Sequence, residues 1–141
     1  LTGHAAGASL LSVYEPDTSP EARSETMADE IRALPFPFAA ALLGMGEDGH
    51  FASLFPDAAN LGEGLDTDSA MLCLPVATAA SPHPRISLSL AALSRSDEIV
   101  LLVFGEKKLS VIEAAKKAEN DLPIARLLRQ KRAPVNVYWA P

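Results

Sequence analysis

Short apolar segments alternate along the chain with segments whose apolar residues recur at helical spacing. Residues 38–46, FAAALLGMG, are almost continuously apolar and end in glycines, which is typical of a buried strand in a parallel sheet. Residues 71–77 and 98–105 are further apolar runs of strand length, and residues 135–141 predict a last strand. Residues 85–90, RISLSL, alternate apolar and polar side chains with the period of two that a strand requires.

Three segments between these strands have the pattern of surface helices. Residues 20–34 begin at Pro20, directly after Ser19, which is a favourable N-cap. Apolar residues in this segment recur at spacings of three to five: Ala22, Met27, Ile31 and Leu34. Residues 106–119 predict an amphipathic helix with lysines on its outer face, and residues 122–130 predict a shorter helix. Strands that alternate with helices predict an α/β domain with a mainly parallel sheet and right-handed crossovers.

The most polar turn of the chain follows the first predicted strand. The segment 42–56, LLGMGEDGHFASLFP, places three glycines, two acidic residues and a histidine between apolar runs. Ligands of open parallel sheets bind at the carboxyl ends of the strands, and glycines let the backbone approach a ligand closely. We expect a short helix from about His50, whose free N–H groups would face negative charge. A tight strand-to-helix connection with Asp48 as N-cap explains the same pattern, so both interpretations stay open.

His50 and Asp48 add chemistry to this turn. Histidine titrates near neutral pH, and a nearby carboxylate can orient its ring and stabilise its protonated form, so such a pair can activate water. A purely structural histidine is the other interpretation, and the spacing alone does not decide between the two. His4, His83 and Cys73 form no ligand pattern with His50, so we expect no metal site.

Two further motifs in the same segment carry little weight. Residues 44–49, GMGEDG, match G-x-G-x-x-G, but no acidic residue follows the next strand where a ribose site would need one. We therefore expect no dinucleotide cofactor. Ser53 is not part of a G-x-S-x-G nucleophile elbow, and we expect it to pack or to form local hydrogen bonds.

Composition narrows the range of partners. The chain has 141 residues, 48% of them hydrophobic. This length and this composition are typical of one soluble globular domain. Twelve basic and 18 acidic residues give a net charge of -6, which argues against nucleic acid and anionic membranes as partners. No apolar run reaches the roughly 18 residues that a membrane span needs. Cys73 is the one cysteine and lies in an apolar run, which predicts a buried thiol in a reducing, cytoplasmic compartment.

The turn closely resembles the G-x-G-x-D-G-H-x-A-S-L-F-P signature of 6-phosphogluconolactonases, members of a larger sugar-phosphate isomerase and deaminase superfamily. Ten positions match: Gly44, Gly46, Asp48, Gly49, His50, Ala52, Ser53, Leu54, Phe55 and Pro56. Phe51 stands where a small polar residue such as Thr is common, and Asp57 stands where Gly is frequent. The resemblance implies a Rossmann-like, mainly parallel sheet flanked by helices, as in the sugar-phosphate isomerases and deaminases.

Two downstream segments resemble the same family. Residues 82–93, PHPRISLSLAAL, are similar to its P-x-x-R-[IV]-[ST]-L-[ST] segment, and residues 103–108, VFGEKK, are similar to its strand-end G-x-x-K. The resemblance implies that Arg85 and Lys108 bind phosphate, since both side chains donate charge-assisted hydrogen bonds to anionic oxygens. Lys107 is the alternative to Lys108. Without the resemblance, Arg85 has the pattern of a surface arginine and Lys108 that of a solvated helix lysine.

The resemblance also implies an activity. This is hydrolysis of 6-phospho-D-glucono-1,5-lactone to 6-phospho-D-gluconate in the pentose phosphate pathway, with a phosphorylated sugar lactone as substrate and no cofactor. His50 would activate the water and Asp48 would hold or polarise the site. Gly44, Gly46 and Gly49 would lie against the substrate, and backbone N–H groups from Gly44 to Gly46 would stabilise the oxyanion.

Two other functions stay open beside this one. In glucosamine-6-phosphate deaminases the equivalent motif resembles D-G-H-[IV]-A-F-N-E-P, with an acidic residue before the proline, where this chain has Phe55. This difference favours the lactonase. The family's N-terminal part, with a Gly-Gly-[ST] phosphate loop and a D-E-R motif, is not found in residues 1–141. We therefore expect one incomplete α/β domain with exposed apolar strand edges, and an inactive sugar-phosphate-binding fragment is the second alternative.

Overall fold

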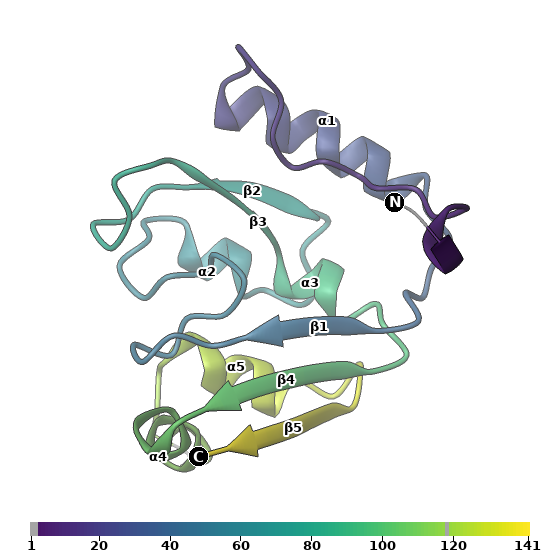
Figure 1. Ribbon diagram of the computed structural model, residues 1–141. Coiled ribbons are helices and arrows are strands. Elements are labelled where there is room, and N and C mark those ends of the chain that lie inside the picture. Colours follow the sequence, from purple (N-terminus) through teal and green to yellow (C-terminus); the bar gives the residue numbers. More distant parts are fainter. Residues whose placement is uncertain (1–2, 118) are drawn as a thin grey trace.

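The computed structural model describes residues 3–117 and 119–141 (Figure 1). Three parallel strands form the main sheet in the order β1-β4-β5: β1 (Ala41–Gly44), β4 (Ile99–Phe104) and β5 (Val135–Ala140). Two further strands, β2 (Cys73–Val76) and β3 (Arg85–Leu88), form a separate antiparallel pair. Because the strands of the main sheet all run the same way, their carboxyl ends lie together at one edge of the sheet.

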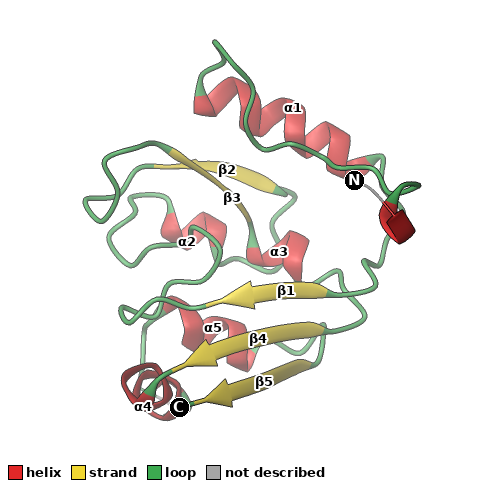
Figure 2. Cartoon of the chain, in the orientation of Figure 1, coloured by secondary structure: helices red, strands yellow, loops and turns green. Residues whose placement is uncertain are grey.

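The described residues form the helices η1 (Gly3–Ala5, a 3-10 helix), α1 (Pro20–Arg32), α2 (Leu61–Gly64), α3 (Leu90–Leu93), α4 (Glu106–Ala115) and α5 (Pro123–Arg129). Helices α4 and α5 pack on the inner face of the main sheet, and α1 packs on the β2–β3 pair. Helix α4 contacts β4 and α5, whereas α1 lies across β2 and β3 (Figure 2). The three predicted helices are confirmed as α1, α4 and α5, each shorter than predicted. Residue 118, inside the second of these predictions, lies outside the described residues.

Helix α1 begins as its sequence predicts, and it buries Met27 and Ile31 as expected, but the ends of its predicted inner face differ. The Ser19 hydroxyl accepts a hydrogen bond from the Ala22 N–H, and Pro20 occupies the first turn. Ala22 and Leu34, which the spacing places on the inner face, are exposed, and Leu34 lies beyond the end of the helix. Arg23 and Ser24 are buried instead.

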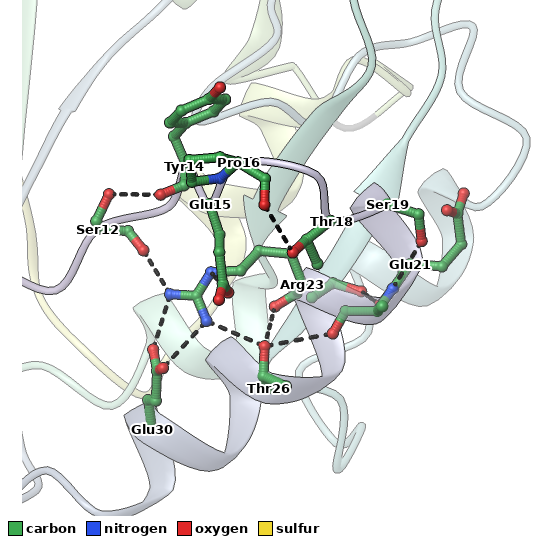
Figure 3. A network of polar contacts seen from close by, with 12 residues as sticks. Ser12, Tyr14, Glu15, Pro16, Thr18, Ser19, Glu21, Arg23, Thr26 and Glu30 are labelled. Atoms are coloured by element: carbon green, nitrogen blue, oxygen red, sulfur yellow. Dashed lines mark hydrogen bonds and ion pairs between the residues drawn. The ribbon is translucent and has the colours of Figure 1, made fainter.

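The burial of Arg23 depends on a polar network at the start of α1 (Figure 3). Its guanidinium donates to both carboxylate oxygens of Glu30, at 3.1 Å and 2.8 Å, to the Thr26 hydroxyl at 3.0 Å, and to the Ser12 carbonyl. The hydrogen bond from Arg23 lowers the pKa of Glu30, so this carboxylate stays ionised. The network thereby ties the extended residues before α1 to the surface of the helix.

The main sheet has one buried and one exposed face. The inward side chains of β4 are at most 1% exposed and pack against α4 and α5: Ile99, Leu101 and Val103. The outward side chains of the three strands are exposed: Leu42 (68%), Leu102 (36%), Phe104 (64%) and Tyr138 (59%). The prediction of buried strands is therefore confirmed for the inner face only, because no described residue covers the outward side chains.

The predicted α/β class, with a parallel sheet flanked by helices, is confirmed. Strands β2 and β3 do not join that sheet but pair with each other, and only residues 77–84 connect them. A parallel pair needs a crossover of about a dozen residues or more, so this short connection permits only antiparallel pairing. Within the described part of the chain, none of the helices has both the length and the apolar composition of a membrane span.

The two faces of β4 predict opposite effects for neighbouring substitutions. We expect Leu101→Ala to lower the free energy of unfolding by about 2–5 kcal/mol, because it opens a cavity in a core where Leu101 is 0% exposed. Leu102→Ala is the matched control, and we expect it to cost less than about 1 kcal/mol because this side chain is already partly in water. Urea unfolding of both variants measures the difference, and equal losses would contradict the assignment of the faces.

Candidate functional site

The turn after β1 closes on itself at the carboxyl edge of the main sheet. The Gly46 N–H donates to the His50 carbonyl at 2.9 Å, and the Gly49 N–H donates to the Gly46 carbonyl at 3.1 Å. Met45 and Phe51 form an isolated antiparallel bridge across the base of the turn. The helix expected from about His50 is not formed, since residues 50–60 consist of turns and isolated bridges. The expected helix and the strand-to-helix connection with Asp48 as N-cap are therefore wrong, whereas the ligand site expected at this turn stays a prediction.

Asp48 holds the ring of His50. Its Oδ1 atom lies 2.6 Å from Nδ1 of His50 and also accepts from the His50 N–H at 3.2 Å. A carboxylate accepts hydrogen bonds, so we assign the proton of the neutral ring to Nδ1, which leaves Nε2 as a free acceptor. The ring also packs on Phe55, with 4.1 Å between the ring centroids. His50 is thus oriented from two sides, and its side chain remains 27% exposed.

Gly46 makes room for this pair. A Cβ atom at this position would lie 2.4 Å from Asp48 Oδ1 and 2.4 Å from two atoms of the His50 ring. The family resemblance predicts that Gly46 lies against the substrate, with its N–H available to an oxyanion. That N–H already donates to the His50 carbonyl, so the structure does not leave it free for this role.

Gly49 connects the turn to the start of α5. It adopts a φ of 78°, in the region that favours glycine, and its carbonyl accepts from the Ile124 N–H at 2.9 Å. A Cβ atom here would lie 3.1 Å from the side chain of Leu122. Gly49 was expected among the substrate-binding residues, but it is buried and attaches the turn to the start of α5.

The residues after His50 turn inward and reach the β2–β3 pair. Phe51 is 0% exposed and belongs to the main core, so its difference from the family pattern lies away from the open side of the turn. The Ser53 N–H donates to the Ser87 hydroxyl at 3.0 Å, 34 residues away in the chain, so this contact is not the local hydrogen bond expected of Ser53. The Asn60 side chain donates to the Pro75 carbonyl at 2.7 Å. These contacts attach the candidate site to the second sheet.

The first turn of α4 lies beside the same turn. Lys107 Nζ is 3.7 Å from Glu47 Oε2, which brings the start of α4 to the residue before Asp48. Lys107 is 82% exposed and has this carboxylate as a partner, whereas Lys108 is half-buried. Trp139 at the end of β5 donates its indole N–H to the Gly105 carbonyl, where α4 begins. The sequence analysis did not single out Trp139, because no motif distinguishes it from a core residue.

Arg85 begins β3 and lies at a different part of this surface. Its Nε donates to the Ser81 hydroxyl at 3.0 Å. Arg85 and Ser53 both line a cavity of about 490 Å³ that Arg23 and Tyr14 also border. Among the described residues, no hydrogen bond or ion pair joins Arg85 to Asp48 or His50. The ion pair of Lys107 with Glu47 links the start of α4 to the turn, and no such contact within the part of the chain that the structure describes links Arg85 to it.

Comparisons with known proteins give this arrangement a context. The family model described as glucosamine-6-phosphate isomerases/6-phosphogluconolactonase matches residues 2–139. A 6-phosphogluconolactonase from Caulobacter vibrioides is 42% identical over 142 residues, and one from Pseudomonas aeruginosa is 35% identical over 143 residues. The alignments cover 99% and 100% of this chain but 60% and 59% of these relatives. The chain thus spans about three fifths of the length of the curated relatives it matches.

Solved structures show the same likeness. A crystal structure of a 6-phosphogluconolactonase from Shewanella baltica has a TM-score of 0.84 and 35% sequence identity, covering 92% of this chain and 55% of that chain. A monomeric glucosamine-6-phosphate deaminase has a TM-score of 0.58 at 16% identity, which shows a shared fold alone. The fold is thus common to lactonases and deaminases, and the side chains of the turn have to distinguish them.

The close approach of Asp48 and His50 to Gly46 predicts different effects for two glycine substitutions. We expect Gly46→Ala to displace the pair, to change the ring-proton NMR shifts of His50, and to lower the free energy of unfolding by about 1–3 kcal/mol. Gly44→Ala is the control, because a Cβ at Gly44 would meet nothing within 4 Å. Unchanged His50 shifts in Gly46→Ala would contradict the packing described for this turn.

Proposed function

Because this chain belongs to the glucosamine-6-phosphate isomerase/6-phosphogluconolactonase family, we propose that it carries the hydrolytic centre for 6-phospho-D-glucono-1,5-lactone. The product is 6-phospho-D-gluconate, and the reaction is the lactonase step of the pentose phosphate pathway. The observation that carries this proposal is the contact of 2.6 Å between Asp48 and His50 at the carboxyl edge of a parallel sheet. Since the chain spans about 60% of its relatives, the activity is proposed for the whole natural protein.

His50 acts as the general base in this proposal. Nε2 takes a proton from a water molecule while the water oxygen bonds to the lactone carbonyl carbon, and the carbonyl oxygen becomes an oxyanion. The tetrahedral intermediate then collapses, the bond from the carbonyl carbon to the ring oxygen breaks, and the proton on His50 passes to that ring oxygen. Asp48 keeps Nδ1 protonated and stabilises the positive charge that the ring carries between the two steps.

The groups around the pair would bind the substrate. Gly44 leaves open space above the end of β1, which supports a close approach of the sugar ring there. Lys108 and Arg85 are the proposed phosphate ligands. Lys108 is preferred over Lys107, because Glu47 already neutralises part of the charge of Lys107. Gly46 contributes by leaving space for the Asp48–His50 pair rather than by donating its N–H.

Phe55 supports lactonase chemistry over deaminase chemistry. The deaminase-like motif has an acidic residue before its proline, and that residue would assist the histidine in ring opening. Here the Phe55 ring occupies this position, is 6% exposed, and packs on the ring of His50. An apolar ring beside the base cannot exchange a proton with an amino sugar, whereas ester hydrolysis needs only one base and an oriented water.

We also propose that residues 1–141 belong to a single α/β domain of a cytoplasmic enzyme. Cys73 supports the location, because it is a free, buried thiol, and free thiols are typical of reducing compartments.

Substitution of His50 tests the proposed base. We expect His50→Ala to lower kcat for fresh lactone by roughly 10²- to 10⁴-fold, after correction for spontaneous hydrolysis. His83→Ala is the matched control, since His83 is exposed in the loop between β2 and β3, and it should keep the wild-type rate. A wild-type rate in His50→Ala would sink the mechanism, and ammonia release from glucosamine 6-phosphate would support the deaminase instead.

The two lysines at the start of α4 allow a paired test of phosphate binding. We expect Lys108→Ala to raise KM roughly 10- to 100-fold, because a charge-assisted hydrogen bond to the phosphate is lost. Lys107→Ala removes only an exposed ion pair with Glu47 and should change KM by less than about threefold. Steady-state kinetics of both variants decides the assignment, which the reverse order of effects would overturn.

A further inference from the structure

The loop between β2 and β3, residues 77–84, is attached to the candidate site by one carboxylate. Asp57 Oδ1 accepts a hydrogen bond from the Thr78 hydroxyl at 2.6 Å, and Asp57 Oδ2 accepts from the Ala79 N–H at 2.8 Å. Both carboxylate oxygens are therefore occupied by neighbours that lie 21 and 22 residues away in the chain. At this position the family's turn motif frequently has Gly, whereas this chain has Asp57.

We propose that Asp57 is a positioning residue that holds the loop 77–84 and, through Ser81, keeps the guanidinium of Arg85 in place for the substrate phosphate. This inference rests on the proposed function, because it takes Arg85 as a phosphate ligand. Asp57 takes no part in the proton transfers proposed for Asp48 and His50.

The contacts within the loop connect the two residues. The Thr78 hydroxyl that donates to Asp57 also accepts from the Ala80 N–H at 3.1 Å, and the Thr78 carbonyl accepts from the Ser81 N–H at 3.4 Å. The Ser81 hydroxyl accepts from Arg85 Nε at 3.0 Å and donates to the His83 carbonyl at 3.0 Å. Ser81 is 8% exposed, so it is a fixed point between the loop and Arg85.

Asp57 is itself fixed to the catalytic turn. Phe55, two residues before it, packs on the His50 ring and is buried in the main core. The Ala58 N–H donates to the Phe55 carbonyl at 3.1 Å, and Ala58 is also buried. The position of Asp57 is thus set by the same packing that orients His50. The Asp57 carboxylate therefore fixes the loop that precedes Arg85 relative to the turn that carries His50.

The hydrogen bonds from Thr78 and Ala79 lower the pKa of Asp57, so the carboxylate stays ionised near neutral pH. Ionisation matters because only a carboxylate accepts at both oxygens. Asp57→Asn keeps one acceptor and loses the other, and Asp57→Gly loses both. These two variants therefore form a graded series that leaves Asp48 and His50 unchanged.

Two measurements on the full natural protein test the proposal. Hydrogen exchange at the amides of residues 78–81 and 83 reports the order of the loop and needs no substrate, since Pro82 and Pro84 have no N–H. We expect exchange there to be faster in Asp57→Asn than in wild type, and faster again in Asp57→Gly, with no change at residues 44–50. The second measurement is KM for the lactone. We expect Asp57→Gly to raise it roughly 3- to 10-fold with little change in kcat, and Asp57→Asn to raise it less.

A double-mutant cycle with Arg85→Ala separates positioning from a merely structural role. If Asp57 acts through Arg85, Asp57→Gly raises KM in the wild-type background and has no further effect in Arg85→Ala. Additive effects would overturn the proposal, as would an unchanged exchange rate in the loop. An unchanged KM in Asp57→Gly, in a protein where Arg85→Ala raises KM, would overturn it as well.

Failure of the proposed function has a different signature. If the wild-type protein shows no lactone turnover, the proposed reaction fails, while hydrogen exchange still decides whether Asp57 holds the loop. Faster exchange in Asp57→Gly then supports the role of Asp57 in holding the loop, and unchanged exchange overturns it.

Discussion

The parallel pairing of β1, β4 and β5 is the constraint on which the rest of this arrangement depends. The inward side chains of β1 and β4 belong to one core with α4 and α5, whereas Val137 and Trp139 of β5 are exposed. Parallel strands end at a common edge, so the turn after β1 and the first turn of α4 have to lie near one another. The ion pair between Lys107 and Glu47 shows that they do. A site assembled from distant parts of the sequence follows directly from strand direction.

The segment after His50 joins this edge to the second sheet. A helix in this place would have carried the chain back across the main sheet. Instead, Phe51 and Phe55 insert into the core, and the residues between and after them bond to β2 and β3 through Ser53 and Asn60. The same short stretch therefore orients the histidine, fills part of the core and connects the two sheets. Such multiple use explains why a long, nearly unbroken motif is needed here, rather than two or three isolated catalytic residues.

Phe55 shows how one side chain can separate two chemistries on one fold. The likeness to both lactonases and a deaminase means that the backbone does not decide the reaction. The ring of Phe55 lies against His50 where the deaminase-like motif has a carboxylate, and in the described part of the chain Asp48 is the carboxylate that contacts the His50 ring. In the proposed function, a single base with a single orienting carboxylate suits the activation of water, and it lacks the second proton carrier that opening an amino sugar requires.

Sequence alone determined the local features of this protein. The order of strands and helices, the start of α1 at Ser19 and Pro20, and the association of Asp48 with His50 depend on residues that are close together in the chain, and periodicity and motifs are sensitive to such patterns. Tertiary structure decided the rest. It used the N–H of Gly46 within the turn, buried Gly49 against α5, and paired Lys107 with Glu47. The last two outcomes rest on contacts between segments far apart in the sequence, and the pattern of one segment contains no information about the neighbour it will meet in the folded chain.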